Sequence, residues 1–267
     1  MIRPLFKYNI KVNRLVSIII FAVLAMYLTI MISMYDPEYN DMLADMMAMF
    51  PEELINALNF NLIGTDLTAF LGSYIYGFLI FLFPMIFVII VNNRLIAKHV
   101  SNGSMVYLLS VPTSRKKVVV TQAIFSIAAI FTLLMATTVF TIVISAIMAP
   151  GELKIGQFLF LNGYTLTFYF CISGITFFAS TVFNDTSRSL ALGAGLPVAF
   201  FVLNMLANAA EGTAWAKNLT LFTLYDLDKF FAGNAGYVII SSLVFVVLGF
   251  LLYGTGSYLF IKKDLSI

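Results

Sequence analysis

Six stretches of this chain, each about 20 residues long or longer, contain no Asp, Glu, Lys or Arg. A helix of about 20 apolar residues is long enough to cross the roughly 30 Å hydrocarbon layer of a membrane. The sequence therefore predicts an all-α membrane protein with six transmembrane helices in a single domain, residues 1–267. The predicted spans are about 16–34, 70–92, 119–148, 157–183, 189–208 and 237–261.

The composition excludes the other fold classes. Hydrophobic residues make up 61% of the chain and charged residues only 10%, whereas a soluble domain carries roughly 25% charged residues. Disordered chains and coiled coils do not tolerate so much uncharged apolar sequence. A transmembrane β-barrel would show alternating segments of about 10 residues. The first apolar run is too long for a cleaved signal peptide, and no small-residue cleavage site follows it.

The residues that build metal sites and disulfides are almost missing. Cys171 is the single cysteine and His99 the single histidine, which excludes a disulfide framework, a thiolate metal cluster, a His-based zinc site and a haem pair within this chain. We predict no catalytic residue and no metal site. Cys171 is interpreted as an apolar filler of the fourth span, and His99 as a solvated interfacial residue rather than a pH switch.

Basic residues gather on one side of the predicted topology. Of the 15 Lys and Arg residues, 12 lie on the side of the two termini and of the loop 93–118, and 11 of the 13 acidic residues lie on the other side. Cytoplasmic loops carry an excess of Lys and Arg. Both termini and the loop 93–118 are therefore predicted to be cytoplasmic, and the segments 35–69 and 209–236 to lie outside.

Residues 1–15 have the pattern of a basic amphipathic helix. The apolar positions recur at helical spacing and the basic positions occupy a different face, the apolar ones being Leu5, Tyr8, Val12 and Leu15 and the basic ones Lys7, Lys11 and Arg14. Such a helix is expected to lie at the inner membrane surface, with its basic side chains toward anionic headgroups. The alternative is a frayed basic tail that only sets the topology.

The loop 93–118 is predicted to contain a short helix. Residues 101–103 form a turn signal, Ser104 can cap a helix that starts at Met105, and Pro112 ends it. An apolar helix is unusual in a cytosolic loop. Either it docks on the protein's own membrane domain, or it is presented to a cytosolic partner protein.

Small residues and prolines in the spans predict close packing and kinks. Ala191, Gly195 and Ala199 form a small-residue stripe on the fifth span, which favours helix packing inside the bundle over packing across a dimer axis. Pro84 and Pro197 are predicted kink points, with neighbouring helices satisfying the freed backbone groups.

The two outer segments differ in character. The segment 35–69 has seven acidic and no basic residues, and one of its short predicted helices begins at Pro51. It is either a gate over an exit path or an interfacial helix that covers span ends. The segment 209–236 is rich in aromatic residues, as expected at a membrane interface, and these are Trp215, Phe222, Tyr225, Phe230 and Phe231.

Motifs for nucleotide binding and for intramembrane hydrolysis are missing. The chain has no G-x-x-x-x-G-K-[ST], H-E-x-x-H or G-x-S-x-G sequence and no Asp pair in its spans. An ion-coupled transporter normally keeps an ionisable residue in its spans, and a channel a polar stripe; no span shows a strong one. Asp185 and Arg188 are expected to cap a helix or to pair across the loop between the fourth and fifth spans, a coupling role being the alternative.

The loop 93–118 carries the ordered set Asn102-Gly103-Ser104-x-x-Tyr107-Leu108-Leu109-Ser110-x-Pro112-x-x-Arg115. This set resembles the cytoplasmic loop of the ABC-2 type permeases, the six-span membrane subunits of type V ABC exporters. The family has an acidic residue where Ser101 stands here. Two further stretches resemble the family's fourth-to-fifth turn and its C-terminal ending, so the resemblance covers nearly the whole chain. They are Phe183-Asn184-Asp185 through Gly193-x-Gly195-x-Pro197, and Phe260-Ile261-Lys262-Lys263-Asp264-Leu265.

The resemblance implies a subunit that pairs with a second permease copy, or a homologous permease, and with two ABC ATPase subunits. ATP and Mg would bind to the ATPase, no cofactor to this chain, and no nucleic acid is involved. The helix Ser104 to Ser110 would be the coupling helix, and the N-terminal helix with Lys7, Lys11 and Arg14 the connecting helix that touches the ATPase. The residues expected to couple to the ATPase are Gly103, Ser104, Met105, Tyr107, Leu108, Leu109, Pro112 and Arg115.

The leading hypothesis is therefore a permease of an ATP-driven exporter in the bacterial cytoplasmic membrane. Charge-free, aromatic-rich spans favour hydrophobic or amphipathic cargo, and family habit places a peptide toxin or antimicrobial peptide ahead of a lipid or drug. The alternative is a membrane sensor or immunity protein that binds a cationic peptide at the acidic segment 35–69 without transport. A membrane enzyme or ion-coupled carrier is disfavoured by the missing residues.

Overall fold

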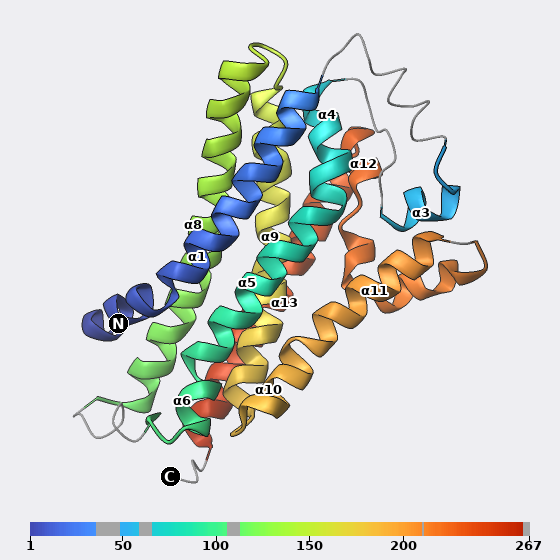
Figure 1. Ribbon diagram of the computed structural model, residues 1–267. Helices are drawn as coiled ribbons and strands as arrows, with labels where there is room; N and C mark the ends of the chain where they lie inside the picture. Colours follow the sequence, from blue (N-terminus) through green and yellow to red (C-terminus); the bar gives the residue numbers. More distant parts are fainter. Residues whose placement is uncertain (36–48, 59–65, 106–112, 210, 264–267) are drawn as a thin grey trace.

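Six long apolar helical segments, each long enough to cross a membrane, make up most of the molecule (Figure 1). The computed structural model describes residues 1–35, 49–58, 66–105, 113–209 and 211–263. The six segments are α1 (Arg3–Met34), α4 to α5 (Leu67–Leu95), α8 (Arg115–Met148), α9 (Ile155–Val182), α10 to α11 (Thr186–Ala209) and α13 (Ala235–Lys262). The predicted six-span architecture is confirmed, and every span except the first agrees with its helix to within about one turn.

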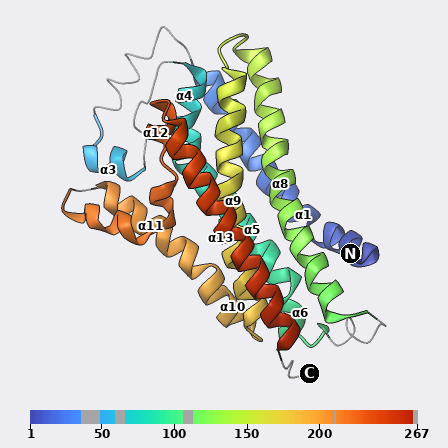
Figure 2. The same cartoon turned by 180° about the vertical axis from the view of Figure 1, so that it is seen from behind.

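Helix α9 forms the centre of the bundle. It packs against α5, α8, α10 and most extensively α13, which crosses over it in Figure 2. Of the six segments, α9 has the lowest mean hydropathy and the largest buried share. The physical reason is that a helix shielded from lipid can carry polar side chains, provided that they find hydrogen-bond partners in the bundle.

Glycines let α9 and α13 approach closely. A methyl group placed on Gly256 of α13 would lie 2.7 Å from Thr181 Oγ1 and 3.2 Å from the Cα atom of Phe178 on α9. A methyl group on Gly174 of α9 would lie 3.4 Å from the Cα atom of Gly249 on α13. The seam between these two helices is therefore built on small residues, as in other close contacts between membrane helices.

The first span is longer than predicted, because residues 3–34 form one continuous helix rather than a separate amphipathic helix and a span. Its first turns point away from the axis of the rest (Figure 1). The Asn13 side chain donates to the backbone carbonyl of Asn9 (3.0 Å), and the Ser17 hydroxyl donates to that of Asn13 (3.1 Å). Side chains that bond to carbonyls one turn earlier commonly bend helices.

Pro84 lies inside α5 (Ile80–Leu95), as predicted, and its effect is absorbed without a break in the helical segment. Proline lacks the N–H that would bond the carbonyl of Ile80, four residues earlier. The Tyr169 hydroxyl of α9 donates to this carbonyl and also to that of Phe81 (2.8 Å). The preceding residues Gly72–Leu79 form a π-helix. A neighbouring helix thus satisfies the freed backbone, as predicted.

The fifth segment is interrupted at Ala194, between α10 (Thr186–Gly193) and α11 (Gly195–Ala209). Pro197 explains the break, because its ring would clash with the carbonyl of Gly193. Helix α11 slants away from the bundle (Figure 1).

The predicted internal packing of the small-residue stripe on this segment is wrong. Ala191, Gly195 and Ala199 are exposed, and a methyl group on Gly195 would touch nothing within 4 Å. It is Gly193, outside the stripe, that packs against α9, where a methyl group would lie 3.1 Å from Ala179 Cβ. The buried residues Ser189, Gly193, Pro197 and Phe201 recur every four residues, and the stripe is offset from them by two residues, which places it on the opposite side of the helix. Packing across a dimer axis stays a prediction.

The segment before α13 also departs from expectation. It forms η3 (Glu211–Leu219), η4 (Leu221–Leu224) and α12 (Leu227–Phe231). Three of its five aromatic residues lie in the core rather than at an interface, and these are Phe222, Tyr225 and Phe230. The Tyr225 ring stacks on Tyr164 of α9 at 4.6 Å between centroids, and its hydroxyl is 2.7 Å from Thr165 Oγ1. Trp215 is 64% exposed.

A short helix, α3 (Glu52–Ala57), begins directly after Pro51, close to the predicted start. Its two glutamates lie in the first turn, where the helix dipole favours negative charge. The remaining predicted helical pattern of the segment 35–69, from Asp41 to Met49, lies almost wholly outside the described residues.

Basic residues share one end of the bundle, as predicted. The end of α13, α6 (Ala97–Ser101), α10 and the start of α8 lie at this end (Figures 1 and 2). We call it the basic end, and its helix termini carry Arg94, Arg115, Arg188 and Lys262. At the opposite end Lys154 pairs with Asp66 at 3.0 Å. The cytoplasmic location of the basic end stays a prediction.

Candidate functional site

The chain turns sharply after α6, at the basic end. Gly103 has a φ of +71°, a left-handed conformation that glycine adopts without strain. Asn102 Oδ1 accepts hydrogen bonds from the backbone N–H (3.2 Å) and the hydroxyl (2.7 Å) of Ser104. The Ser104 hydroxyl also lies 2.8 Å from His99 Nδ1. The predicted turn is confirmed, and the side chain of Ser104 holds this turn together.

Met105, which follows the turn, is 1% exposed and belongs to the core. Met105 therefore docks on the protein's own membrane domain. This is the first of the two alternatives that the sequence left open for the apolar helix. Tyr107, Leu108, Leu109 and Pro112 lie outside the described residues, so the position of the predicted coupling helix is a prediction throughout.

Arg115 begins α8, which Ser114 caps by accepting the N–H of Lys117 (3.3 Å). The Arg115 guanidinium donates to the carbonyl of Lys263 (2.8 Å), and the Lys263 ammonium donates to that of Thr181 (3.2 Å) at the end of α9. Burial lowers the pKa of Lys263 to about 8. These two bonds join the end of α9, the end of α13 and the start of α8. Lys263, which belongs to the C-terminal stretch that resembles the family, therefore has a structural role.

The N-terminal turns of α1 lie against this end of α8. The buried face consists of Leu5, Asn9 and Asn13, and the backbone N–H of Ile2 donates to Thr121 Oγ1 (2.8 Å). Of the predicted apolar face, Leu5 packs on the bundle, whereas Tyr8, Val12 and Leu15 are exposed. The bundle thus covers a polar face of this helix and leaves most of the apolar face available to lipid.

The basic residues of this helix, Lys7, Lys11 and Arg14, are exposed and form no ion pair with any residue that the structure describes. On the same helix the ring of Tyr8 approaches that of His99, with centroids 6.3 Å apart. The predicted connecting helix therefore contacts the segment that leads into the predicted coupling helix.

A chain of buried hydrogen bonds starts on this helix. Asn9 Nδ2 donates to Gln122 Oε1 (2.5 Å), and Gln122 Nε2 donates to the carbonyl of Leu95 (2.9 Å). Leu95 is the last residue of α5, where a carbonyl has no partner within its own helix. Gln122 therefore ties α1 and α8 to the end of α5, directly before α6.

A second set of bonds ties the same end of α5 to α9. The Ser180 hydroxyl donates to the carbonyl of Asn92 (2.7 Å) and accepts from the N–H of Ala97 (3.0 Å). Asn92 Nδ2 donates to Ser173 Oγ (3.1 Å) and Thr176 Oγ1 (2.5 Å). Both ends of the α5–α6 junction are thus fixed by side chains of neighbouring helices.

The bonds continue to α13. The Tyr253 hydroxyl lies 2.6 Å from Ser126 Oγ on α8 and 2.8 Å from Ser173 Oγ on α9. We call the whole set the polar network, and its members are Asn9, Asn92, Gln122, Ser126, Ser173, Thr176, Ser180 and Tyr253. It joins α1, α5, α8, α9 and α13 and contains no side chain that is charged at neutral pH.

The polar network was not predicted from the sequence. A signal was present, because Ser173, Thr176 and Ser180 are spaced i, i+3 and i+7 on one helix face. A second buried polar row lies on α8, at Thr137, Thr138, Thr141 and Ser145. The expectation that no span carries a strong polar stripe is therefore wrong for α8 and α9, where the row faces the bundle instead of lipid.

Asp185 caps α10 by accepting the backbone N–H of Arg188 (3.3 Å). The predicted cap is confirmed. The two side chains are exposed and form no ion pair with each other or with any other described residue.

One known protein family matches this chain. The model of the ABC-2 family transporter proteins matches residues 6–265, almost the full length of the chain and every helix described above. The chain belongs to the ABC-2 transporter family. Curated proteins gave no match, and solved structures gave none either.

An ABC-2 permease is a membrane transport component, and the family implies partnership with an ABC ATPase subunit. In this permease the α5–α6 junction is hydrogen-bonded to α8 and α9 together. The last carbonyl of α5 and the first N–H of α6 are thus both held by side chains of other spans.

His99 is half-buried beside Ser104, rather than solvated as predicted, and we expect it to make the stability of the permease depend on pH. Burial, and next the charge of Lys98, lower the pKa of His99 below its usual 6.5. As the pH falls below 6.5, His99 becomes protonated in the unfolded chain but stays neutral in the folded permease. The free energy of unfolding therefore decreases until the pH falls below the pKa of His99 in the folded state. We expect the purified permease to lose thermal stability between about pH 7.5 and 5.5.

The substitution His99→Gln should reduce this loss, since glutamine stays neutral and can still bond to Ser104. The measurement is the melting temperature of the two proteins across that pH range. An equal loss in both would contradict the assignment, because other titrating groups would then account for the whole effect.

Proposed function

We propose that this permease is the transmembrane subunit of an ATP-driven exporter in the bacterial cytoplasmic membrane. Two permease copies, or this chain and a homologous permease, would pair with two ABC ATPase subunits that bind ATP and Mg. The basic end would face the cytoplasm, in line with the enrichment of Lys and Arg in cytoplasmic loops.

The predicted coupling helix Ser104 to Ser110 would dock in a groove of the ATPase, and the exposed Lys7, Lys11 and Arg14 would lie beside it. The observation that carries this proposal is the hydrogen bonding of the α5–α6 junction, where the Leu95 carbonyl and the Ala97 N–H are held by α8 and α9. Motion of the docked helix would pass through this junction to the spans.

The proposed cargo is hydrophobic or amphipathic, with a peptide toxin or antimicrobial peptide as first choice. The six spans carry no charged residue in their central parts, and a charged or sugar-like cargo would need polar partners along its path. The polar network is buried between helices, and its groups bond to one another except for Asn92 Oδ1, which has almost no accessible surface, so the network does not offer such partners.

The test is ATP hydrolysis by the permease purified with its ATPase in lipid, with and without amphipathic peptides. We expect a stable complex, peptide-stimulated hydrolysis, and loss of both complex and stimulation in Leu108→Asp. Leu219→Asp is the matched control, because Leu219 is an exposed leucine (55%) at the end of η3, outside the predicted coupling loop. It should behave as the unsubstituted permease.

Each result separates the proposals. A stable complex without peptide stimulation keeps the transporter and discards the peptide cargo. Normal complex formation by Leu108→Asp contradicts the coupling-helix assignment. If no ATPase associates with the permease at all, the exporter proposal fails and the sensor alternative replaces it.

A further inference from the structure

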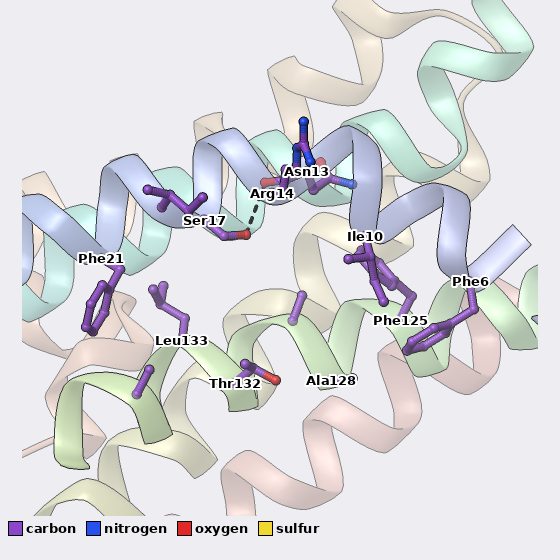
Figure 3. Close-up of a pocket in the computed structure, with 13 residues that line it drawn as sticks. Phe6, Ile10, Asn13, Arg14, Ser17, Phe21, Phe125, Ala128, Thr132 and Leu133 are labelled. Carbon is purple, nitrogen blue, oxygen red and sulfur yellow. Dashed lines mark hydrogen bonds between the residues drawn. The ribbon is translucent and has the colours of Figure 1, made fainter. Parts of the chain in front are cut away.

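A groove of about 410 Å³ lies between α1 and α8 on the outside of the bundle (Figure 3). Its walls include Phe6, Ile10 and Phe21 from α1 and Phe125, Leu133 and Ala136 from α8. Phe6 and Phe21 are 15 residues apart, which corresponds to about 22 Å along a helix. The groove is therefore long enough to hold part of an extended hydrocarbon chain.

One buried polar atom beside this apolar groove has no partner. Asn13 lines the groove and is 3% exposed. Its Nδ2 donates to the carbonyl of Asn9, but its Oδ1 has no hydrogen-bond partner. A buried amide oxygen without a donor is costly in an apolar setting. This oxygen has almost no accessible surface, so it offers no contact to an occupant of the groove.

The rim of the groove is positively charged. Arg14 borders the groove beside Asn13, and its side chain points out of it (Figure 3). Residues 1–35 contain four basic residues and no acidic one. An occupant with a negative group outside the groove and an apolar chain inside it would complement both the charge and the walls.

We propose that this groove binds one anionic phospholipid, for which phosphatidylglycerol is the probe. One acyl chain lies between α1 and α8, on the side of Arg14 toward Phe21, and the phosphate lies near Arg14. The proposal does not depend on coupling to the ATPase, because its test measures bound lipid on the permease alone. The bound lipid would fill the space between the N-terminal helix and α8 and hold the two at a fixed distance.

The test uses the full-length permease, equilibrated in vesicles of equal parts phosphatidylglycerol and phosphatidylethanolamine and then transferred to mild detergent. Native mass spectrometry counts the lipids that stay bound. We expect one phosphatidylglycerol per permease. Ala136→Phe should abolish its retention by filling the groove, and Arg14→Gln should weaken it about fivefold, the value of one basic residue near an anionic lipid.

Two variants serve as matched controls. Val139→Phe adds the same ring to an exposed position of α8 outside the groove, and Lys11→Gln removes a basic residue of α1 that does not line it. Both should retain the lipid. Because Arg14 is an exposed side chain, Arg14→Gln tests the site even if Ala136→Phe does not fold.

Three outcomes would overturn the proposal. Equal retention of the two lipids would show that the headgroup is not recognised. Unchanged retention in both Ala136→Phe and Arg14→Gln would place the lipid elsewhere. Conversion of a dimer to a monomer by Ala136→Phe, without a change in bound lipid, would assign the groove to a second copy of this chain.

Discussion

Replacing Gly256 by leucine should destabilise the permease by roughly 1–3 kcal/mol or prevent its folding, the range for overfilling a packed core. A side chain at this position would begin 2.7 Å from Thr181 Oγ1 and 3.2 Å from the Cα atom of Phe178. The second contact is with backbone, so no rotamer change relieves it. Helix α13 would have to move away from α9, and this seam is the largest contact between any two helices described.

Gly254→Leu is the matched control on the same helix. Gly254 is exposed, and a methyl group there would touch nothing within 4 Å. Replacing a helical glycine by leucine should raise helix stability by a few tenths of a kcal/mol. Thermal unfolding in detergent compares the two variants with the unsubstituted permease. Similar melting temperatures for Gly254→Leu and Gly256→Leu would show that the α9–α13 seam does not have the close contact described.

Removal of the Tyr169 hydroxyl should cost about 1–3 kcal/mol, the penalty of a buried polar group without its partner. This hydroxyl donates to the carbonyls of Ile80 and Phe81 on α5. The Ile80 carbonyl depends on it, because Pro84 has no N–H to offer. We therefore expect Tyr169→Phe to lower the melting temperature, although the ring that packs in the core is kept.

A double-mutant cycle with Pro84→Ala isolates the cause. Alanine at position 84 restores an N–H that can bond the Ile80 carbonyl, so the same Tyr169→Phe change should cost clearly less in that background. The coupling energy is the difference between the two costs. A cost that is equal with and without Pro84 would mean that Tyr169 stabilises α5 for a reason unrelated to the proline.

The spans and their boundaries could be predicted from the sequence because they depend on a local property. A run of about 20 residues without charge is sufficient for a helix to cross a membrane, whatever surrounds it. The turn at Gly103, the cap at Asp185 and the bend imposed by Pro197 are likewise short-range effects of single residues. The structure contains all of them.

The candidate site was only partly predictable. The coupling segment is predicted from its own residues. The polar network that holds the preceding α5–α6 junction could not be predicted in this way, because its members come from five helices. Gln122 looks in the sequence like one polar residue in an apolar run. Only the arrangement of α1, α5 and α8 shows that its amide bonds both Asn9 and the end of α5.

The amino-acid sequence by itself determined the number of spans and the gathering of basic residues at one end, since both follow from the free energy of placing residues in lipid or in water. Tertiary structure decided which faces of the helices meet. Gly195 and Gly256 are the same residue type, yet a methyl group placed on Gly195 would meet nothing within 4 Å, whereas one placed on Gly256 would meet α9. The physical reason is that all spans are apolar on most sides, so hydrophobicity does not distinguish a face toward lipid from a face toward protein, and packing and buried hydrogen bonds make that choice.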